Sequence, residues 1–317
     1  MNKKILLTAI GSFSADAAVK SLKNIGFQVF GCDIYPSEWH AVSQECNAVF
    51  RAPLATDDNY IPFLLDLCRQ NEIGYLVPLT DLEIDVINNN RKSFKQANVV
   101  VCIPSPEALS IARDKYHLYQ TFLEDSEVPS ILTYKSGEID FSRLPLPAIA
   151  KPYNGRSSEG LQRIVDESVL ASYNQKEGYI IQECIEGPVF TVDYVRNSVT
   201  GSDVAIARQE LLRTKNGAGV TVKMIEDNKL VALVKHIGSK LDINGCINME
   251  FISHNGKYYL IDINPRFSAG VAFSSVVGYD MEKNHLYCFL HKEIDSQIEY
   301  KTSIVTKRYK EEVLWVE

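Results

Sequence analysis

The first third of the chain alternates short apolar runs with amphipathic segments, and this alternation constrains the fold more than any other feature. It predicts strands at Ile5–Ile10, Gln28–Cys32, Tyr75–Pro78 and Val99–Ile103, with helices at Ala15–Ile25 and Tyr60–Asn71. Strands separated by helices form a parallel sheet with helices on its faces. We therefore expect a parallel-sheet domain over residues 1–105, with any ligand at the carboxyl ends of its strands.

The turn after the first run argues against a nicotinamide-dependent oxidoreductase. A dinucleotide fingerprint needs three glycines, and the segment Ala9–Ser14 contains only Gly11. Asp33 ends the second predicted strand, where it either binds a ribose or caps the strand.

Composition excludes several classes of protein. The 317 residues are 45% hydrophobic, which is enough for two or three subdomains. The net charge is -7, and without a long basic run nucleic-acid binding has no electrostatic support. Seven cysteines without a CxxC pair indicate reduced thiols and no zinc site. No apolar run reaches membrane-spanning length. We expect a cytoplasmic protein with no nucleic-acid or membrane partner.

Prolines mark the end of the first domain. Pro104 and Pro106 precede a predicted helix at Glu107–Asp125. A small β-rich part is expected to about residue 190 and a larger mixed part beyond it. The charged tail from Ser296 could form a strand near Ile304.

The segment Asp262-Ile263-Asn264-Pro265-Arg266 carries the most chemistry. Its alternation predicts a strand with Asp262, Asn264 and Arg266 on one face. Carboxylate and amide oxygens suit hard cations, and a guanidinium suits a phosphoryl group. The pattern therefore predicts a magnesium-phosphate site, although a solvent-facing polar edge would look similar.

The turn before this strand decides whether Glu250 joins the site. A two-residue turn at Asn255–Gly256 would point Glu250 away from Asp262. A three-residue loop at His254–Gly256 would pair Glu250 with Leu260, diagonal to Asp262. We expect the three-residue loop, because only it gathers the two carboxylates.

A loop rich in glycine and serine follows the strand that is predicted to end at Lys151. The segment from Tyr153 to Gly160 includes Ser157 and Ser158, whose hydroxyl groups and backbone N–H groups suit phosphate oxygens. It is not a P-loop, since no Lys-Ser/Thr pair follows Gly160. A flexible hairpin is the alternative.

Two further segments are weaker signals. The main chain at Glu183–Ile185, where an apolar strand enters an acidic bend, could offer a donor and an acceptor to a flat base. Ala207–Gly219 places cations before a Gly-rich turn, which suggests a mobile, anion-facing loop. An ordinary strand and turn, or a solvated charged turn, would explain each equally well.

Taken in order, these motifs resemble the ATP-grasp superfamily, and within it stand-alone relatives of the carbamoyl-phosphate synthase large subunit. The motifs are Lys115, Lys151 with its loop, Glu183–Gly187, Glu250 and Asp262–Arg266, and the resemblance spans roughly residues 1–290. It implies an ATP-grasp fold with α/β and α+β parts. Its expected divisions are a Rossmann-like pre-ATP-grasp domain (1–105), a small subdomain with linker helix and phosphate lid (106–190), and a large subdomain with the metal site and C-terminal tail (191–317).

The resemblance also implies roles for individual residues. ATP phosphates would meet Lys115 and Lys151 under a lid formed by Tyr153, Ser157, Ser158 and Gly160, and adenine would meet Glu183, Cys184, Ile185 and Glu186. One or two Mg²⁺ ions, or Mn²⁺, would be held by Glu250, Asp262 and Asn264. Arg266, with Arg213, would stabilise the γ-phosphoryl group in transfer. Where the family usually has a ribose-binding acid, this chain has Pro188, Val189 and Phe190. Either Glu186 substitutes or the ribose is held differently.

The implied reaction is the joining of a carboxylate to an amine through an acyl phosphate, with release of ADP and phosphate. Its substrates would be small molecules, and a homodimer is plausible for such ligases, although nothing in the sequence establishes it. Ser268 and the Gly270 backbone would bind the carboxylate side, and Thr80, Asp81 and Glu83 could meet the amine. Two alternatives remain: a carbamoyl- or carboxy-phosphate-forming enzyme that uses bicarbonate, and a non-catalytic ATP-binding protein.

Overall fold

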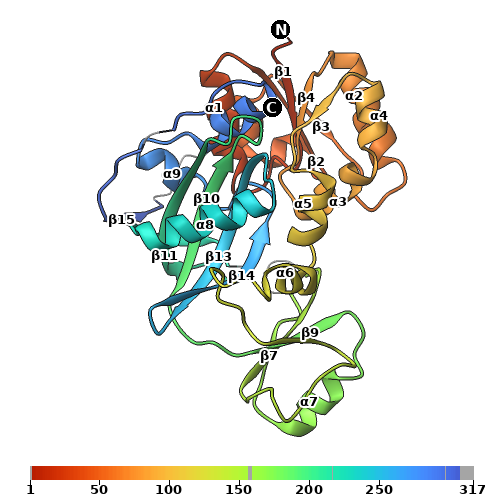
Figure 1. Cartoon of the computed structure of the whole chain (residues 1–317). Coiled ribbons are helices and arrows are strands. Elements are labelled where there is room, and N and C mark those ends of the chain that lie inside the picture. Colours follow the sequence, from red (N-terminus) through yellow and green to blue (C-terminus); the bar gives the residue numbers. More distant parts are fainter. Residues whose placement is uncertain (1, 156–158, 216, 297, 308–317) are drawn as a thin grey trace.

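Three sheets with their helices make up the fold (Figure 1). The structure, a computed structural model, describes residues 2–155, 159–215, 217–296 and 298–307. The N-terminal sheet and the large sheet lie side by side, and the small sheet projects from them below α6 (Figure 1). Within the described residues, no helix is long and apolar enough to cross a membrane.

The N-terminal sheet is parallel, as predicted, with strand order β3-β2-β1-β4-β5. Its strands are β1 (Lys4–Leu7), β2 (Gln28–Asp33), β3 (Ala48–Arg51), β4 (Tyr75–Val77) and β5 (Val100–Val101). Its helices are α1 (Ala15–Asn24), α2 (Tyr60–Asn71), α3 (Asp81–Asn89) and α4 (Arg91–Gln96), with 3-10 turns at Ser37–Trp39 and Ala41–Glu45. Alternate residues of β1 enter different cores, because Leu6 packs with α2 whereas Ile5 and Leu7 pack with α1.

The single helix predicted at Glu107–Asp125 is wrong. The chain forms α5 (Pro106–Ala112) and α6 (Lys115–Phe122), separated at Arg113 and Asp114. Asp114 has an extended backbone, and its carboxylate accepts hydrogen bonds from the N–H groups of Tyr116 and His117 at 2.8 and 3.0 Å. This N-cap begins a new helix and places Lys115 in its first turn.

The small sheet is antiparallel, with strand order β6-β9-β7-β8. Its strands are β6 (Thr133–Lys135), β7 (Ala148–Pro152), β8 (Gln162–Ile164) and β9 (Tyr179–Glu183), and its helix is α7 (Glu167–Tyr173). Leu170 of α7 packs on Ala148, Ala150 and Ile181 to form a separate small core.

The large sheet is also antiparallel, with strand order β14-β13-β10-β11-β12-β15. Its strands are β10 (Val189–Arg196), β11 (Asp203–Arg213), β12 (Gly219–Ile225), β13 (Gly245–His254), β14 (Lys257–Asn264) and β15 (Ser303–Thr306). Its helices are α8 (Asn228–Lys240), α9 (Ala272–Val276) and α10 (Met281–Phe289). The strand expected near Ile304 is therefore present as β15.

The two faces of the large sheet differ. One face is apolar and is covered by α8, whose Leu230, Val234 and Ile237 are fully buried there. The other face is apolar only at the end where Val204 and Cys246 join the N-terminal core. Towards its other end it becomes polar, and that part forms the candidate site.

Candidate functional site

A row of polar side chains crosses four strands of the large sheet. Glu250 of β13 lies opposite Asp262 of β14 on one side and opposite Thr191 of β10 on the other, and Thr191 lies opposite Arg208 of β11. Two residue pairs further along, Asn248 lies opposite Asn264. Because side chains alternate between faces along a strand, both pairs of β13 and β14 share one face.

The turn of the β13–β14 hairpin differs from the prediction. His254 pairs with Lys257, so the turn has only two residues, Asn255 and Gly256, with φ values of 48° and 70°. Two left-handed residues in succession suit the right-handed twist of a hairpin. The expected three-residue loop, and the expected pairing of Glu250 with Leu260, are both wrong.

A β-bulge nevertheless brings the two carboxylates onto one face. Phe251 pairs with Leu260 and Glu250 with Asp262, so Ile261 is an extra residue in β14. In a regular hairpin without this bulge, Ile261 would lie opposite Glu250, and the Asp262 side chain would point towards the apolar face of the sheet. The bulge also presents the Ile261 carbonyl oxygen to Lys151 Nζ at 3.3 Å.

Two lysines approach Asp262 from different segments. Lys115 Nζ lies 3.2 Å from Asp262 Oδ1 and donates to the Gly155 carbonyl oxygen at 2.9 Å. Burial is the main cause that lowers the pKa of Lys151 to about 8; Asp262 opposes this shift and the charge of Lys115 adds to it. The N–H of Lys115 also donates to the Tyr153 carbonyl oxygen at 2.8 Å, which ties the start of the predicted lid to α6. Ser157 and Ser158 lie outside the described residues, and Gly160 is described with a φ of 70°.

An arginine compensates the negative charge of Glu250. Burial raises the pKa of Glu250, and Arg213, whose Nη2 donates to Glu250 Oε1 at 2.9 Å, opposes this shift. Among the described residues no group of three or more His, Cys, Asp or Glu is placed to hold a metal ion. The predicted set instead combines two facing carboxylates with the Asn264 amide. Arg213 compensates the negative charge of Glu250, and Lys115 compensates that of Asp262. The carboxylate and amide oxygens of the set are the donors that a hard divalent ion prefers.

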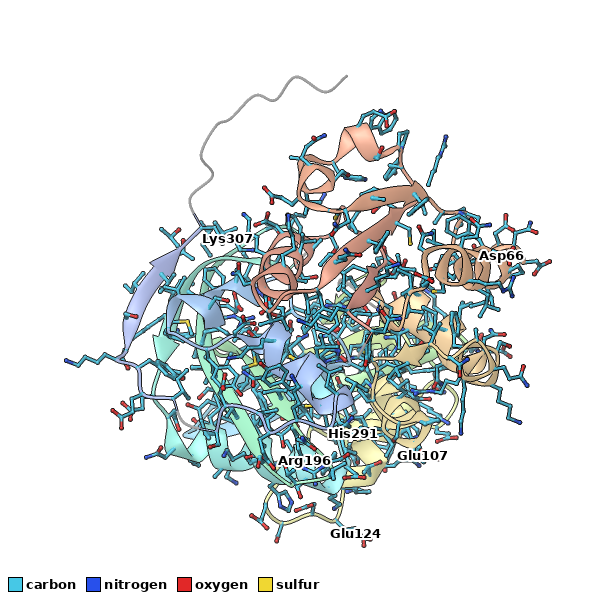
Figure 2. The ribbon with its side chains drawn as sticks, turned by 90° about the horizontal axis from the view of Figure 1, so that it is seen from above. Asp66, Glu107, Glu124, Arg196, His291 and Lys307 are labelled. Carbon is cyan, nitrogen blue, oxygen red and sulfur yellow. The ribbon has the colours of Figure 1, made fainter. Side chains whose placement is uncertain are left out.

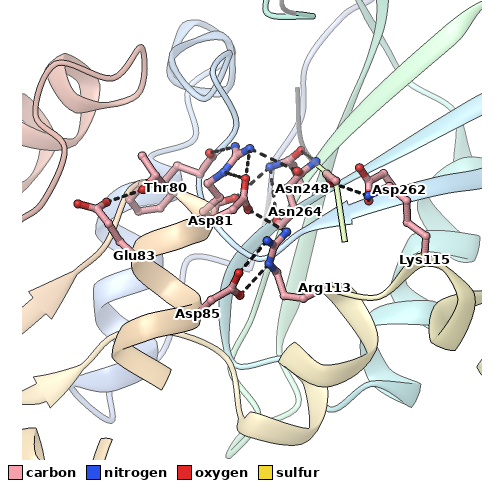
Figure 3. A network of polar contacts seen from close by, with 12 residues as sticks. Thr80, Asp81, Glu83, Asp85, Arg113, Lys115, Asn248, Asp262 and Asn264 are labelled. Carbon is pink, nitrogen blue, oxygen red and sulfur yellow. Dashed lines mark hydrogen bonds and ion pairs between the residues drawn. The ribbon is translucent and has the colours of Figure 1, made fainter. Parts of the chain in front are cut away.

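Arg266 is held by the N-terminal domain. Its Nε and Nη2 atoms donate to Asp81 Oδ2 at 3.1 and 2.9 Å, and Nη2 also reaches Asn264 Oδ1 at 3.3 Å (Figure 3). Arg113 forms two hydrogen bonds to Asp85 and lies 3.7 Å from the other Asp81 oxygen. Burial alone would raise the pKa of Asp81, but Arg266 and Arg113 together hold it below its ordinary value.

Of the two acids expected to meet an amine, only Asp81 lines the cavity described below. Glu83 is buried and accepts hydrogen bonds from Tyr60 and Thr80 at 2.9 and 2.7 Å (Figure 3). Asp81 begins α3, and two residues along a helix turn a side chain by about 200°. Glu83 therefore enters the N-terminal core, where burial raises its pKa.

A buried cluster around Arg208 was not singled out from the sequence. Arg208 is 1% exposed and donates to Asp193 at 2.6 Å, Ser268 Oγ at 2.9 Å and Glu210 at 3.3 Å. A Cβ added at Gly270 would lie 3.0 Å from Arg208 Nη2. The mobile loop suggested for Ala207–Gly219 is wrong over most of its length, because β11 continues to Arg213. The signal available was alternation, since Val204, Ile206 and Arg208 share a face.

The bend after β9 uses part of its main chain internally. The N–H groups of Glu183 and Cys184 donate to the carbonyl oxygens of Leu132 and Pro147 at 3.0 and 3.2 Å. In the described part of the chain, the Ile185 N–H has no acceptor, so it is available to a ligand. Glu186 pairs with Arg163 at 2.9 Å on the surface.

Asp33, which the sequence left as either a ribose-binding or a capping residue, caps the turn after β1. Its Oδ2 accepts from the Gly11 N–H at 2.9 Å, and its Oδ1 lies 3.3 Å from His40 Nε2. Its oxygens are thereby engaged with the protein. This arrangement fixes Gly11–Ser14, which forms part of the cavity wall.

A cavity of about 560 Å³ lies between the N-terminal sheet and the polar face of the large sheet. Among the described residues, its walls include Gly11–Ser14, Leu79–Leu82, Gly217–Gly219 and Phe267–Gly270. Of the predicted site residues it brings together Asp81, Arg213, Glu250, Asp262, Asn264, Arg266, Ser268 and Gly270. Lys115 joins them through Asp262, and Lys151 lies beside the Ile261 carbonyl. A smaller cavity of about 30 Å³ adjoins Lys115, Gln182 and Leu260.

Comparison with known proteins agrees with this architecture. A family described as an ATP-grasp domain matches residues 112–270, and a PylC-like N-terminal domain matches residues 5–102. The carbamoyl phosphate synthase large chain of Clostridium botulinum (strain Loch Maree / Type A3) is 20% identical over 308 residues, which cover 87% of this chain and 28% of that protein. The chain thus spans little more than a quarter of the length of this curated relative.

Solved structures show the same fold. Biotin carboxylase from Campylobacter jejuni, in a β-γ-ATP complex, has a TM-score of 0.80 at 17% identity, covering 93% of this chain and 72% of that one. N5-carboxyaminoimidazole synthetase from Staphylococcus aureus, complexed with ADP, has a TM-score of 0.75 at 14% identity, covering 96% and 83%. The expected resemblance is therefore confirmed, and the chain belongs to the ATP-grasp family.

Proposed function

We propose that this protein is an ATP- and Mg²⁺-dependent ligase that activates a carboxylate as an acyl phosphate and joins it to an amine, forming a carbon–nitrogen bond. The observation that carries the proposal is the facing pair Glu250 and Asp262 at the cavity, each compensated by a cation from another segment. ADP and phosphate are the other products.

ATP would lie between the small and large sheets. Lys115 and Lys151 would bind its phosphates, because their ammonium groups lie 3.2 Å from Asp262 Oδ1 and 3.3 Å from the Ile261 carbonyl oxygen. The segment Tyr153–Gly160 would cover the phosphates. Adenine would meet the bend Glu183–Glu186, where the Ile185 N–H supplies a free donor.

Glu250, Asp262 and Asn264 would hold one or two Mg²⁺ ions; a solved relative, the biotin carboxylase domain of Hydrogenobacter thermophilus 2-oxoglutarate carboxylase, contains MgADP. The bound ion would neutralise phosphate oxygens. Since Glu250 is half-buried and its pKa is raised, it would gain from a cation at this position, and Arg213 would then be released towards the phosphoryl group.

The reaction needs charge stabilisation more than acid–base chemistry. A carboxylate oxygen attacks the γ-phosphorus as the bond to ADP breaks, and the amine nitrogen then displaces phosphate from the acyl carbon. Arg266 would stabilise the transferring group, with Asp81 keeping its guanidinium in place. Ser268 and the Gly270 backbone would position the carboxylate at the end of the cavity. Such a ligase would work in the cytoplasm, as a monomer or a homodimer.

A second candidate is the formation of carboxy phosphate from bicarbonate. The observation that favours it is the similarity to biotin carboxylase and to the Hydrogenobacter carboxylase domain, whose solved complex contains bicarbonate. Stimulation of ADP release by bicarbonate alone would select this reaction.

Purified protein with Mg-ATP should release ADP in the presence of pooled amino acids and small carboxylates. Asp262→Ala should abolish this release, whereas Asp66→Ala, which removes an exposed carboxylate on α2, should leave it unchanged. Thermal-shift measurements should detect ATP but not NADH. If ATP gives no shift, the proposal fails; if ATP binds but no pool or bicarbonate releases ADP, a non-catalytic ATP-binding protein is the better description.

A further inference from the structure

The C-terminal segment brings a lysine against the wall of the cavity. Strand β15 pairs with β12, and the N–H of Lys307, directly after β15, donates to the Val220 carbonyl oxygen at 2.9 Å. Figure 2 labels Lys307 where the described part of this segment ends. Its side chain reaches to the other wall, where Nζ donates to the Ala269 carbonyl oxygen at 2.9 Å. Lys307 therefore bridges β12 and the segment that follows Arg266.

Two aromatic rings hold the ammonium group at this place. Lys307 Nζ lies 5.5 Å from the ring centroid of Phe13 and 5.4 Å from that of Phe273. Both are cation–π distances. Phe13 belongs to the N-terminal domain, lines the cavity and is 60% exposed. The ammonium thus lies against two residues of the cavity wall, Phe13 of the N-terminal domain and Ala269, which follows the large sheet.

Within the described residues, no carboxylate forms an ion pair with the Lys307 ammonium group. Across the described residues, no carboxylate lies within 4.0 Å of Lys307, and its one hydrogen-bond acceptor is the Ala269 carbonyl. An ammonium group has three donors, so two remain for a ligand. Arg208 and Glu210 are its charged neighbours. The negative charge of Glu210 partly offsets the effect of burial, but this carboxylate is itself paired with Arg208 at 3.3 Å and Arg213 at 3.9 Å. Burial, together with Arg208, lowers the pKa of Lys307.

We propose that Lys307 is a substrate-binding residue whose ammonium binds an anionic oxygen group, a carboxylate or a phosphate, of the molecule that occupies the cavity. A half-buried cation without a carboxylate at ion-pair distance is costly, and an anionic ligand would reduce that cost. The inference rests on the proposed function for the identity of the reacting group. The role of Lys307 further implies that the substrate carries a second anionic group besides the carboxylate that is activated. The C-terminal segment would recognise this second group.

Binding can be measured without turnover. Calorimetry on the full chain with Mg-ADP would compare glutarate, glutamate and glycerol 3-phosphate with butyrate and glycerol, which lack the additional anionic group. At least one of the three anionic probes should bind, and Lys307→Met should weaken it about tenfold or more. Lys307→Arg, which keeps the charge, should restore most of the affinity. A preference for glycerol 3-phosphate over the dicarboxylates would identify the group as a phosphate.

Two controls separate binding from a structural role. Lys301→Met removes an exposed charge from the same segment and should change nothing. Thr306→Val removes the 2.8 Å contact between the hydroxyl groups of Thr306 and Thr221, and should lower Tm while leaving anion binding intact. The inference is overturned if no anionic probe binds the wild-type protein, or if Lys307→Met binds it equally well.

These results are independent of the ligase assay. Loss of ADP release in Asp262→Ala together with unchanged anion binding in Lys307→Met would support the proposed reaction and reject the role of Lys307. Anion binding that depends on Lys307, in a protein that releases no ADP with any pool, would reject the reaction and keep the binding site.

Discussion

Arg266 directs two of its N–H groups at one oxygen of Asp81, 185 residues earlier in the chain, at 3.1 and 2.9 Å. Asp81 begins α3 of the N-terminal domain, and Arg266 follows β14 of the large sheet. The position of the arginine therefore depends on how the two domains pack, and Arg113 strengthens this dependence by compensating the other oxygen of Asp81.

Asp81→Asn should impair catalysis without impairing ATP binding. The substitution leaves Arg266 and Arg113 without their shared carboxylate, so we expect turnover to fall by roughly tenfold to a hundredfold. Mg-ATP affinity should stay within about twofold, because Lys115 and Lys151 are untouched. ADP-release kinetics and calorimetry provide the two measurements.

A double-mutant cycle tests whether Asp81 acts through Arg266. If it does, Arg266→Gln should cost nearly as much as the double variant, with a coupling energy of about 1–3 kcal/mol. Additive losses would show that Asp81 contacts the substrate independently, as an amine-binding acid would.

This pair illustrates what sequence could and could not predict. The alternation of strands and helices was sufficient to predict the N-terminal parallel sheet, and the order of the motifs was sufficient to predict the ATP-grasp part. Both predictions depend on local sequence patterns. That Asp81 would meet Arg266 depends on the packing of two domains, which no local pattern encodes. The break at Asp114 was predictable in principle, since an Asp before a helical segment is a common N-cap.

The β14 bulge is a second feature beyond local patterns. Regular pairing from the Asn255–Gly256 turn would have placed Asp262 on the apolar face, and sequence reasoning avoided this with a longer loop. The chain instead accommodates an extra residue, Ile261. A hairpin can change its register by a longer turn or by a bulge in a strand, and the packing of both faces decides between them. Here Leu260 and Ile263 pack towards α8.

Deletion of Ile261 should separate the two roles of the bulge. Glu250 would still pair with Asp262, but Lys151 would lose its carbonyl acceptor, so Mg-ATP affinity should fall by about tenfold in a protein that remains folded. Ile261→Ala keeps the bulge and its carbonyl and should bind Mg-ATP normally. Equal affinities in the two variants would show that the carbonyl does not position Lys151.

Gly270→Ala should affect the cavity and not the nucleotide site. The added methyl group would lie 3.0 Å from both Arg208 Nη2 and the Phe273 ring, closer than ordinary contact, and Asp193 and Ser268 keep Arg208 from moving away. We expect a loss of about 1 kcal/mol in stability and a KM for the cavity substrate raised severalfold. The Kd for Mg-ATP should be unchanged; a matching loss of ATP affinity would place Gly270 in the nucleotide site.

Glu282→Gln should stabilise the protein in a pH-dependent way. Burial raises the pKa of Glu282 to about 8, and the negative charges of Asp280 and Asp193 add to the shift. The native state therefore keeps a proton that the unfolded state loses above about pH 4.5, its ordinary value. Stability from this group is fully present below that pH and is lost as the pH rises through about 8, since ionisation of the unfolded chain increasingly favours unfolding.

The variant carries no ionisable group at this position, so its advantage over the wild-type protein should grow from pH 5 to pH 8 and then level off. Thermal unfolding at several pH values should show a difference that reaches about 5 °C or more at the alkaline end. Glu293→Gln, which changes an exposed carboxylate near the end of the same helix, should give no pH-dependent difference. A constant offset in Glu282→Gln at every pH would mean that Glu282 ionises in the native state much as it does in the unfolded chain, and that its neighbours or water compensate the charge.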